Sequence, residues 1–264
     1  MRADAAQSAA RIDRIAAAFG SHGKRAALMP YLMGGYPSLD ESRAIGVACA
    51  DAGADLVELG VPFSDPLADG PVIHAAATEV LRAGVTPLWV LEVCAALSER
   101  LPVVLMAYAN LALGHAGFVE RAQAAGAAGL IVPDLPHDEA AGLRAELDAR
   151  GMALVPLAAP TTTEERMAEI GADARGFVYT VSLTGTTGER DSLPPEIERT
   201  VARVRAATDV PVAVGFGIST PEHASAVADV ADGVIVGSRL VRAAGEGGAD
   251  AVGNLVRALA EALA

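Results

Sequence analysis

Residues 50 to 58, Ala50-Asp51-Ala52-Gly53-Ala54-Asp55-Leu56-Val57-Glu58, join the end of a helix to a short apolar strand. Glycine is the residue that most often terminates a helix, and a brief apolar run after it is typical of a buried strand. The pattern recurs at residues 124–132 and 169–179, and similar joints precede residues 153–157 and 234–236. The chain is therefore predicted to be a series of αβ units.

Eight apolar runs separated by helical segments are expected to be the strands, namely residues 27–31, 56–58, 103–106, 130–132, 153–157, 177–179, 212–214 and 234–236. Eight parallel strands alternating with helices predict an α/β fold of the (β/α)8 TIM-barrel class. The 264 residues suit one such domain, spanning 1–264. A doubly wound open sheet is the alternative, but no Gly-x-Gly-x-x-Gly motif follows the first strand.

The first twenty residues are expected to form an extra N-terminal helix. Ile12, Ile15, Ala16 and Phe19 repeat at the spacing of one helical face. We expect this face to close the floor of the barrel, at the amino ends of the strands. An amphipathic helix on a membrane surface or a partner is the other interpretation, and the shortness of the apolar stripe disfavours it.

Composition limits the possible functions. No apolar run approaches the roughly 18 residues of a membrane span, and the charged amino terminus does not resemble a signal peptide, so we expect a cytoplasmic protein without membrane association. A net charge of −13 disfavours nucleic-acid binding. Cys49 and Cys94 lie in helical stretches and are expected to be buried, unreactive thiols.

The basic side chains exclude two kinds of aldol chemistry. The one lysine, Lys24, precedes the first strand and is expected on the barrel floor, away from the site where a Schiff base would form. The five histidines are scattered without the spacing of a metal site, so no metal is expected. Acid–base chemistry by carboxylates remains.

Two candidate carboxylates lie in the segment Val57 to Pro71. Glu58 interrupts an apolar strand, where a charge is costly unless it is paired or its pKa is shifted. Asp69 lies in the following loop, close enough to return to the same pocket. The alternative is an ion pair between Glu58 and an arginine, with Asp65 and Asp69 only forming turns.

Two further segments are candidates for ligand contact. The long interval after the sixth strand contains residues 182–194, a polar, glycine-containing segment expected to be a lid loop. Glycines at 215, 217 and 237, after the last two strands, predict a phosphate site made of backbone amides and a short helix beginning after Gly237. Tight turns alone are the alternative interpretation of these glycines.

Seven runs carry a resemblance to the tryptophan synthase alpha subunit family, at residues 29–37, 57–71, 106–110, 133–136, 187–188, 215–219 and 237–238. The resemblance covers nearly the whole chain from about Arg11. It implies a lyase of tryptophan biosynthesis that performs retro-aldol cleavage of indole-3-glycerol phosphate to indole and D-glyceraldehyde 3-phosphate. It also implies an α2β2 complex whose beta subunit carries pyridoxal phosphate and receives the indole, with no cofactor in the alpha chain.

The resemblance assigns roles to individual residues. It places the catalytic pair on Glu58 and Asp69, and the phosphate and lid contacts on Thr187, Gly188, Gly217, Gly237 and Ser238. Tyr31 and Phe216 are expected to form walls of the indole pocket, with Tyr179 as a neighbour of the reacting groups.

The sequence departs from the family pattern at Leu183, Thr186 and His74, which concerns the lid and the interface more than the catalytic pair. Two other functions remain open at this stage. One is a related phosphate-binding barrel isomerase, and the other is a non-catalytic allosteric partner.

Overall fold

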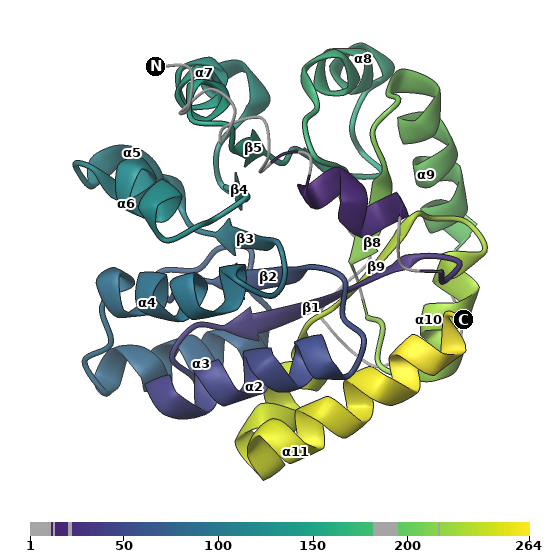
Figure 1. The fold of residues 1–264 in the computed structure, drawn as a ribbon. Helices are drawn as coiled ribbons and strands as arrows, with labels where there is room; N and C mark the ends of the chain where they lie inside the picture. The colour runs from purple at the N-terminus through teal and green to yellow at the C-terminus, as the bar shows by residue number, and fades with distance from the viewer. Residues whose placement is uncertain (1–11, 13, 21–22, 182–194, 216) are drawn as a thin grey trace.

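The computed structural model describes residues 12, 14–20, 23–181, 195–215 and 217–264, and Figure 1 shows the strands at the centre with helices around them. The strands are β1 (Ala27–Met33), β2 (Val57–Gly60), β3 (Val103–Met106), β4 (Gly129–Ile131), β5 (Ala153–Leu154), β6 (Leu157–Ala158), β7 (Val178–Val181), β8 (Val212–Gly215) and β9 (Gly233–Val236). The helices are α2 (Leu39–Asp51), α3 (Pro71–Arg82), α4 (Pro87–Ser98), α5 (Ala109–Gly114), α6 (Phe118–Ala124), the 3-10 helix η1 (His137–Glu139), α7 (Ala141–Ala149), α8 (Glu164–Asp173), α9 (Pro195–Ala207), α10 (Pro221–Ala228) and α11 (Ser238–Ala262).

The strands form one parallel sheet in the order β5-β4-β3-β2-β1-β9-β8-β7-β6. Its two edges, β5 and β6, are consecutive pieces of one extended segment, so the sheet curls into a barrel. The predicted (β/α)8 class is confirmed, and the open doubly wound sheet is wrong.

The fifth predicted strand, residues 153–157, is divided into β5 and β6 by Pro156. Proline has no N–H and interrupts the ladder of hydrogen bonds. Pairing nevertheless continues across the break, because the N–H of Val155 donates to the carbonyl of Leu130 (2.9 Å) and the carbonyl of Pro156 accepts from Tyr179 (2.9 Å). The segment thus closes the barrel between β4 and β7.

The N-terminal segment packs into the barrel interior, as expected. Residues 14–20 are helical, and Ile15, fully buried, belongs to the apolar cluster inside the barrel. The ring of Phe19 lies 5.6 Å from that of Phe177, which immediately precedes β7. Lys24 Nζ lies 2.7 Å from Asp55 Oδ2 just before β2, so the one lysine is on the barrel floor, as predicted. Residues 1–11 lie outside the described part.

The glycines predicted to end the helices do so in only some of the αβ units. Gly53, Gly126 and Gly151 have φ values of +99°, +81° and +66°, the left-handed conformation expected at a helix end. Gly171 instead lies inside α8, where a Cβ would overlap the carbonyl of Ala207 in the next helix. This glycine serves close helix packing rather than helix termination.

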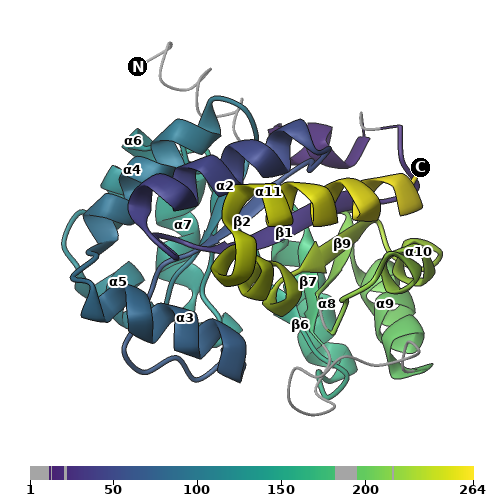
Figure 2. The same ribbon diagram turned by 90° about the horizontal axis from the view of Figure 1, so that it is seen from below.

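The helices form the outer layer, and Figure 2 shows α2 and α11 side by side on one flank. Cys49 in α2 and Cys94 in α4 are buried and free, and burial raises the pKa of each thiol to about 12, which suppresses thiolate chemistry. In the described part of the chain no single helix is long and apolar enough to cross a membrane. The pair α3 and α4 reaches that length and composition only together, across a bend of 112°.

Candidate active site

A pocket of about 580 Å³ opens at the carboxyl ends of the strands, opposite the floor helix. Its lining includes seven predicted site residues: Tyr31, Glu58, Asp69, Tyr179, Gly217, Gly237 and Ser238. They come from β1, β2 and β7 and from the segments that follow β2, β8 and β9. The barrel topology therefore gathers residues that are separated by more than 200 positions in sequence.

Glu58 lies on β2, in register with Tyr31 on β1 and Val104 on β3. Its side chain is only 1% exposed, and neither carboxylate oxygen has a hydrogen-bond partner within the described residues. Burial, together with the charge of Asp69, raises the pKa of Glu58 from 4.5 to about 8. Among the described residues, therefore, no arginine forms the alternative ion pair with Glu58. With this pKa the carboxyl group holds a proton at neutral pH.

Asp69 lies in the loop between β2 and α3 and lines the same pocket. Burial raises the pKa of its carboxyl group, while a hydrogen bond from Tyr108 and the proximity of His74 lower it. Asp65, in the same loop, is exposed and does not line the pocket. The two carboxylates that meet are thus Glu58 and Asp69.

Two tyrosines complete the polar interior. The hydroxyl of Tyr31 lies over Gly60 and that of Tyr179 over Gly215, and a Cβ at either glycine would overlap the hydroxyl. Burial is the largest cause that raises both tyrosine pKa values, followed by the charges of the two carboxylates. Both hydroxyls therefore keep their protons at neutral pH.

The far end of the pocket has the features of an anion site. Gly237 immediately precedes α11, whose N-terminal residue Ser238 also lines the pocket. A Cβ at Gly237 would meet Tyr31 and Ile73 only at 3.6 and 3.7 Å, which is ordinary contact, so packing does not require a glycine there. Backbone amides at a helix N-terminus favour negative charge. The helix predicted after Gly237 begins at Ser238 as the first part of α11, and it is short, because non-helical backbone at Gly247 and Gly248 separates it from the second part.

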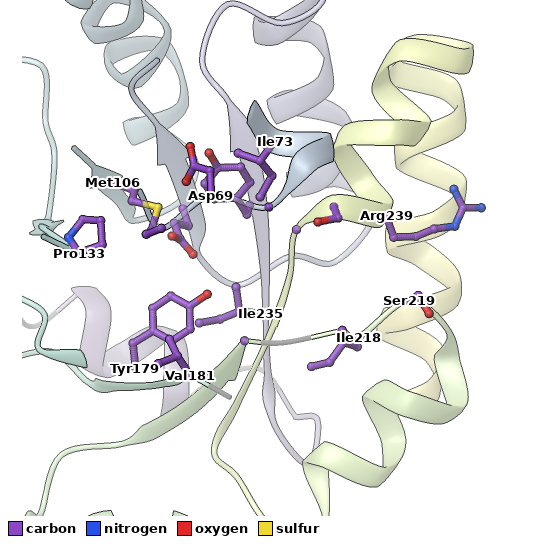
Figure 3. Close-up of a pocket in the computed structure, with 18 of the residues that line it drawn as sticks. Asp69, Ile73, Met106, Pro133, Tyr179, Val181, Ile218, Ser219, Ile235 and Arg239 are labelled. Atoms are coloured by element: carbon purple, nitrogen blue, oxygen red, sulfur yellow. The ribbon is translucent and has the colours of Figure 1, made fainter. Parts of the chain in front are cut away.

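Figure 3 shows how the labelled side chains lie around this space: Asp69 and Tyr179 extend into it, whereas the guanidinium of Arg239 is directed away from Asp69. Some pocket residues received no individual role from the sequence, although Met106, Pro133, Ile218 and Ser219 lie in the runs that resemble the family; others include Ile73, Leu157, Arg239 and Arg242. Most are apolar and look like ordinary core positions in sequence. Only their position at the strand ends distinguishes them.

Some predicted residues lie outside the described part of the chain. They are Thr187 and Gly188 in the expected lid loop 182–194, the departures Leu183 and Thr186 in the same segment, and Phe216. The departure His74 is described, and it is an exposed residue of α3.

Comparison with known proteins shows the family of this chain. The family model "Tryptophan synthase alpha chain" matches residues 19–262. The chain is 48% identical to the tryptophan synthase alpha chain of Carboxydothermus hydrogenoformans over 235 residues, with 88% of each covered. It is 49% identical to that of Halorhodospira halophila over 232 residues, with 86% of this chain and 85% of the relative covered.

Solved structures agree. A structure of tryptophan synthase from M. tuberculosis superposes with a TM-score of 0.88 at 38% identity, over 95% of this chain and 98% of the other. The alpha chain from Legionella pneumophila gives 0.85 at 34% identity, over 96% and 97%. The resemblance noted in the sequence is thus confirmed, and this chain belongs to the tryptophan synthase alpha chain family, the lyases that cleave indole-3-glycerol phosphate in tryptophan biosynthesis.

Proposed function

We propose that Glu58 and Asp69 carry out the retro-aldol cleavage of indole-3-glycerol phosphate in this pocket. The observation that carries the proposal is the pair itself. Glu58 is a buried carboxyl group with no hydrogen-bond partner among the described residues and a pKa raised to about 8, and it shares the pocket with a second carboxylate that accepts a hydrogen bond. When two neighbouring carboxyl groups have different pKa values, the one with the higher pKa can act as the acid while the other stays an anion.

The protonated Glu58 would donate its proton to C3 of the indole ring, which places positive charge on the ring nitrogen. Asp69, as an anion, would accept the hydrogen bond of the ring N–H and stabilise that cation. The Glu58 carboxylate would then take the proton of the adjacent glycerol hydroxyl as the carbon–carbon bond breaks. The bonding electrons return to the ring, an aldehyde forms, and Glu58 ends protonated as it began.

Substrate binding would use the rest of the pocket. The apolar residues Ile73, Met106 and Leu157 suit an indole ring, with Tyr31 and Tyr179 beside the reacting atoms. The amides near Gly217, Gly237 and Ser238 would hold the phosphate at the N-terminus of α11. Such recognition is local, in keeping with a chain whose net charge of −13 repels anions at long range. This chain needs no cofactor for these steps.

The partner would be a tryptophan synthase beta subunit, in an α2β2 complex whose pyridoxal phosphate belongs to the beta chain. Solved relatives at high structural similarity are tryptophan synthases, which supports such a partner. Leu67, 80% exposed and adjacent in sequence to the pocket residue Ala68, and Leu113, 56% exposed in α5, place apolar surface on two segments that follow strand ends. Exposed apolar groups of this kind suit a docking surface.

The test is to supply indole-3-glycerol phosphate to the purified chain, with and without a beta subunit, and to measure indole and glyceraldehyde 3-phosphate. We expect the two products in equal amounts. An isomerised sugar phosphate without indole would favour the barrel-isomerase alternative. No product in either condition, with the substrate bound, would favour a non-catalytic partner.

A further inference from the structure

Tyr108 makes contacts in the site that are independent of substrate. It lies two residues after the end of β3 and immediately before α5, and it is 3% exposed. Its hydroxyl accepts a hydrogen bond from the N–H of Ala68 at 3.1 Å and donates to the carboxylate of Asp69. One hydroxyl therefore contacts the backbone and the side chain of consecutive residues in the loop after β2.

The tyrosine is held by parts of the barrel other than that loop. The N–H of Ala107 donates to the carbonyl of Ile131 at 3.0 Å, and the N–H of Ala109 donates to Asp134 Oδ1 at 2.8 Å. Both neighbours of Tyr108 are thus bonded to β4 or to the loop that follows it. On the side of the loop after β2, the ring stacks on Phe63, with centroids 5.0 Å apart and an interplanar angle of 24°.

We propose that Tyr108 is a positioning residue that fixes the Asp69 carboxylate toward the substrate. The proposal rests on the role of Asp69 given above. A side chain anchored to β3 and β4 aims a carboxylate on a loop that has no regular structure of its own. Such support from a neighbouring hydrogen bond is how a reactive group keeps its orientation.

The charges around the pair agree with this role. Asp69 is faced by Glu58 from β2, His74 from α3, and Tyr31 and Tyr179 from β1 and β7. Asp134 acts on Tyr108 from the loop after β4. Burial is the main cause that raises the pKa of the Tyr108 hydroxyl, so it stays a donor, and donation to a carboxylate lowers the pKa of the acid.

The variant Tyr108→Phe tests the proposal, because it keeps the ring on Phe63 and removes only the hydroxyl. We expect kcat to fall roughly ten- to a hundredfold with KM changed far less. The acid limb of the kcat/KM profile should move to higher pH. A direct readout is the carbon-13 titration of the Asp69 carboxyl, identified with Asp69→Asn, whose pKa should rise by about one unit in the variant. Tyr36→Phe, a tyrosine outside the pocket, is the matched control and should leave all three unchanged.

The outcomes separate this inference from the proposed function. If the Asp69 titration moves but kcat does not, the contact exists and Asp69 lacks the catalytic role. If neither the titration nor the acid limb moves, or if stability alone changes, Tyr108 is only structural and the inference is overturned. If Tyr108→Phe does not fold, Phe63→Leu keeps the hydroxyl but loosens the ring, and it should raise the Asp69 pKa by a smaller amount. An unchanged titration there would also overturn the inference.

Discussion

At the scale of single residues, the account depends on one buried carboxyl group. Most buried ionisable side chains are paired, whereas Glu58 is 1% exposed and has no hydrogen-bond partner within the described residues. The pKa that results, about 8, lies where a general acid works best at neutral pH. The same burial that prepares the acid makes the folded chain sensitive to pH.

That sensitivity gives the first prediction. Between pH 4.5 and about 8 the folded chain keeps the proton on Glu58 while the unfolded chain has lost it, so the free energy of unfolding falls as pH rises through this range. Each unit of pKa displacement corresponds to about 1.4 kcal/mol. Urea unfolding at several pH values should show this slope in the native chain and a flatter one in Glu58→Gln, with Glu79→Gln on α3 as a control. Equal slopes in native and variant chains would contradict the raised pKa.

Asp69 gives the second prediction. Asp69→Asn keeps the size of the side chain but cannot stabilise a cationic ring, so turnover should fall roughly a hundredfold or more, measured as indole release. An analogue without the ring N–H should react slowly with the native chain, and Asp69→Asn should slow its turnover only slightly further. If the analogue reacted as fast as the natural substrate, Asp69 would not act on the ring nitrogen.

At the scale of elements, the carboxyl ends of the parallel strands bring the site residues together. β2 supplies Glu58 and the loop that contains Asp69, β7 supplies Tyr179, and β9 leads into the N-terminus of α11. The glycine at that joint is not required by the packing of the protein, since a Cβ there would make only ordinary contacts. The proposed phosphate, approaching the backbone at this joint, would account for the glycine.

The third prediction follows from this joint. Gly237→Val should weaken binding of glycerol 3-phosphate at least about tenfold, because the side chain blocks approach to the amides. Isothermal titration of the folded variant measures this. Gly142→Val, on the exposed side of α7 with open space around it, is the control and should bind normally. Gly217 is less suitable, because its φ of +62° would strain any substitution. Unchanged affinity in Gly237→Val would place the phosphate elsewhere.

Much of this arrangement could be predicted from sequence, because helix–glycine–strand joints fix the αβ period and the period fixes which residues meet at the strand ends. The apolar pattern predicts one continuous strand through Pro156, because it reflects side-chain hydrophobicity and not the backbone N–H that proline lacks. The packing role of Gly171 could not be predicted, because it depends on the contact between α8 and α9 in the folded chain. The role of Tyr108 could not be predicted from neighbouring residues, because its hydrogen-bond partners lie about 40 positions away in sequence and meet it only in the folded barrel.

At the scale of the whole molecule, the barrel separates stability from chemistry. Ile15 and the Lys24–Asp55 pair close the floor, while the carboxylates, tyrosines and glycines gather at the other end. This division lets loops after the strands carry the reaction without disturbing the core. The exposed Leu67 and Leu113, on the segments that follow β2 and β3, are where we expect a beta subunit to influence those loops.

The most direct measurement of the central claim compares native chain and Glu58→Gln in two assays at once: release of indole from indole-3-glycerol phosphate, and affinity for a non-cleavable indole alkyl phosphate. Because glutamine preserves size but cannot transfer a proton, the account predicts that indole release falls by roughly three orders of magnitude or more while affinity stays within a few-fold. Near-native indole release by a folded Glu58→Gln chain would contradict it.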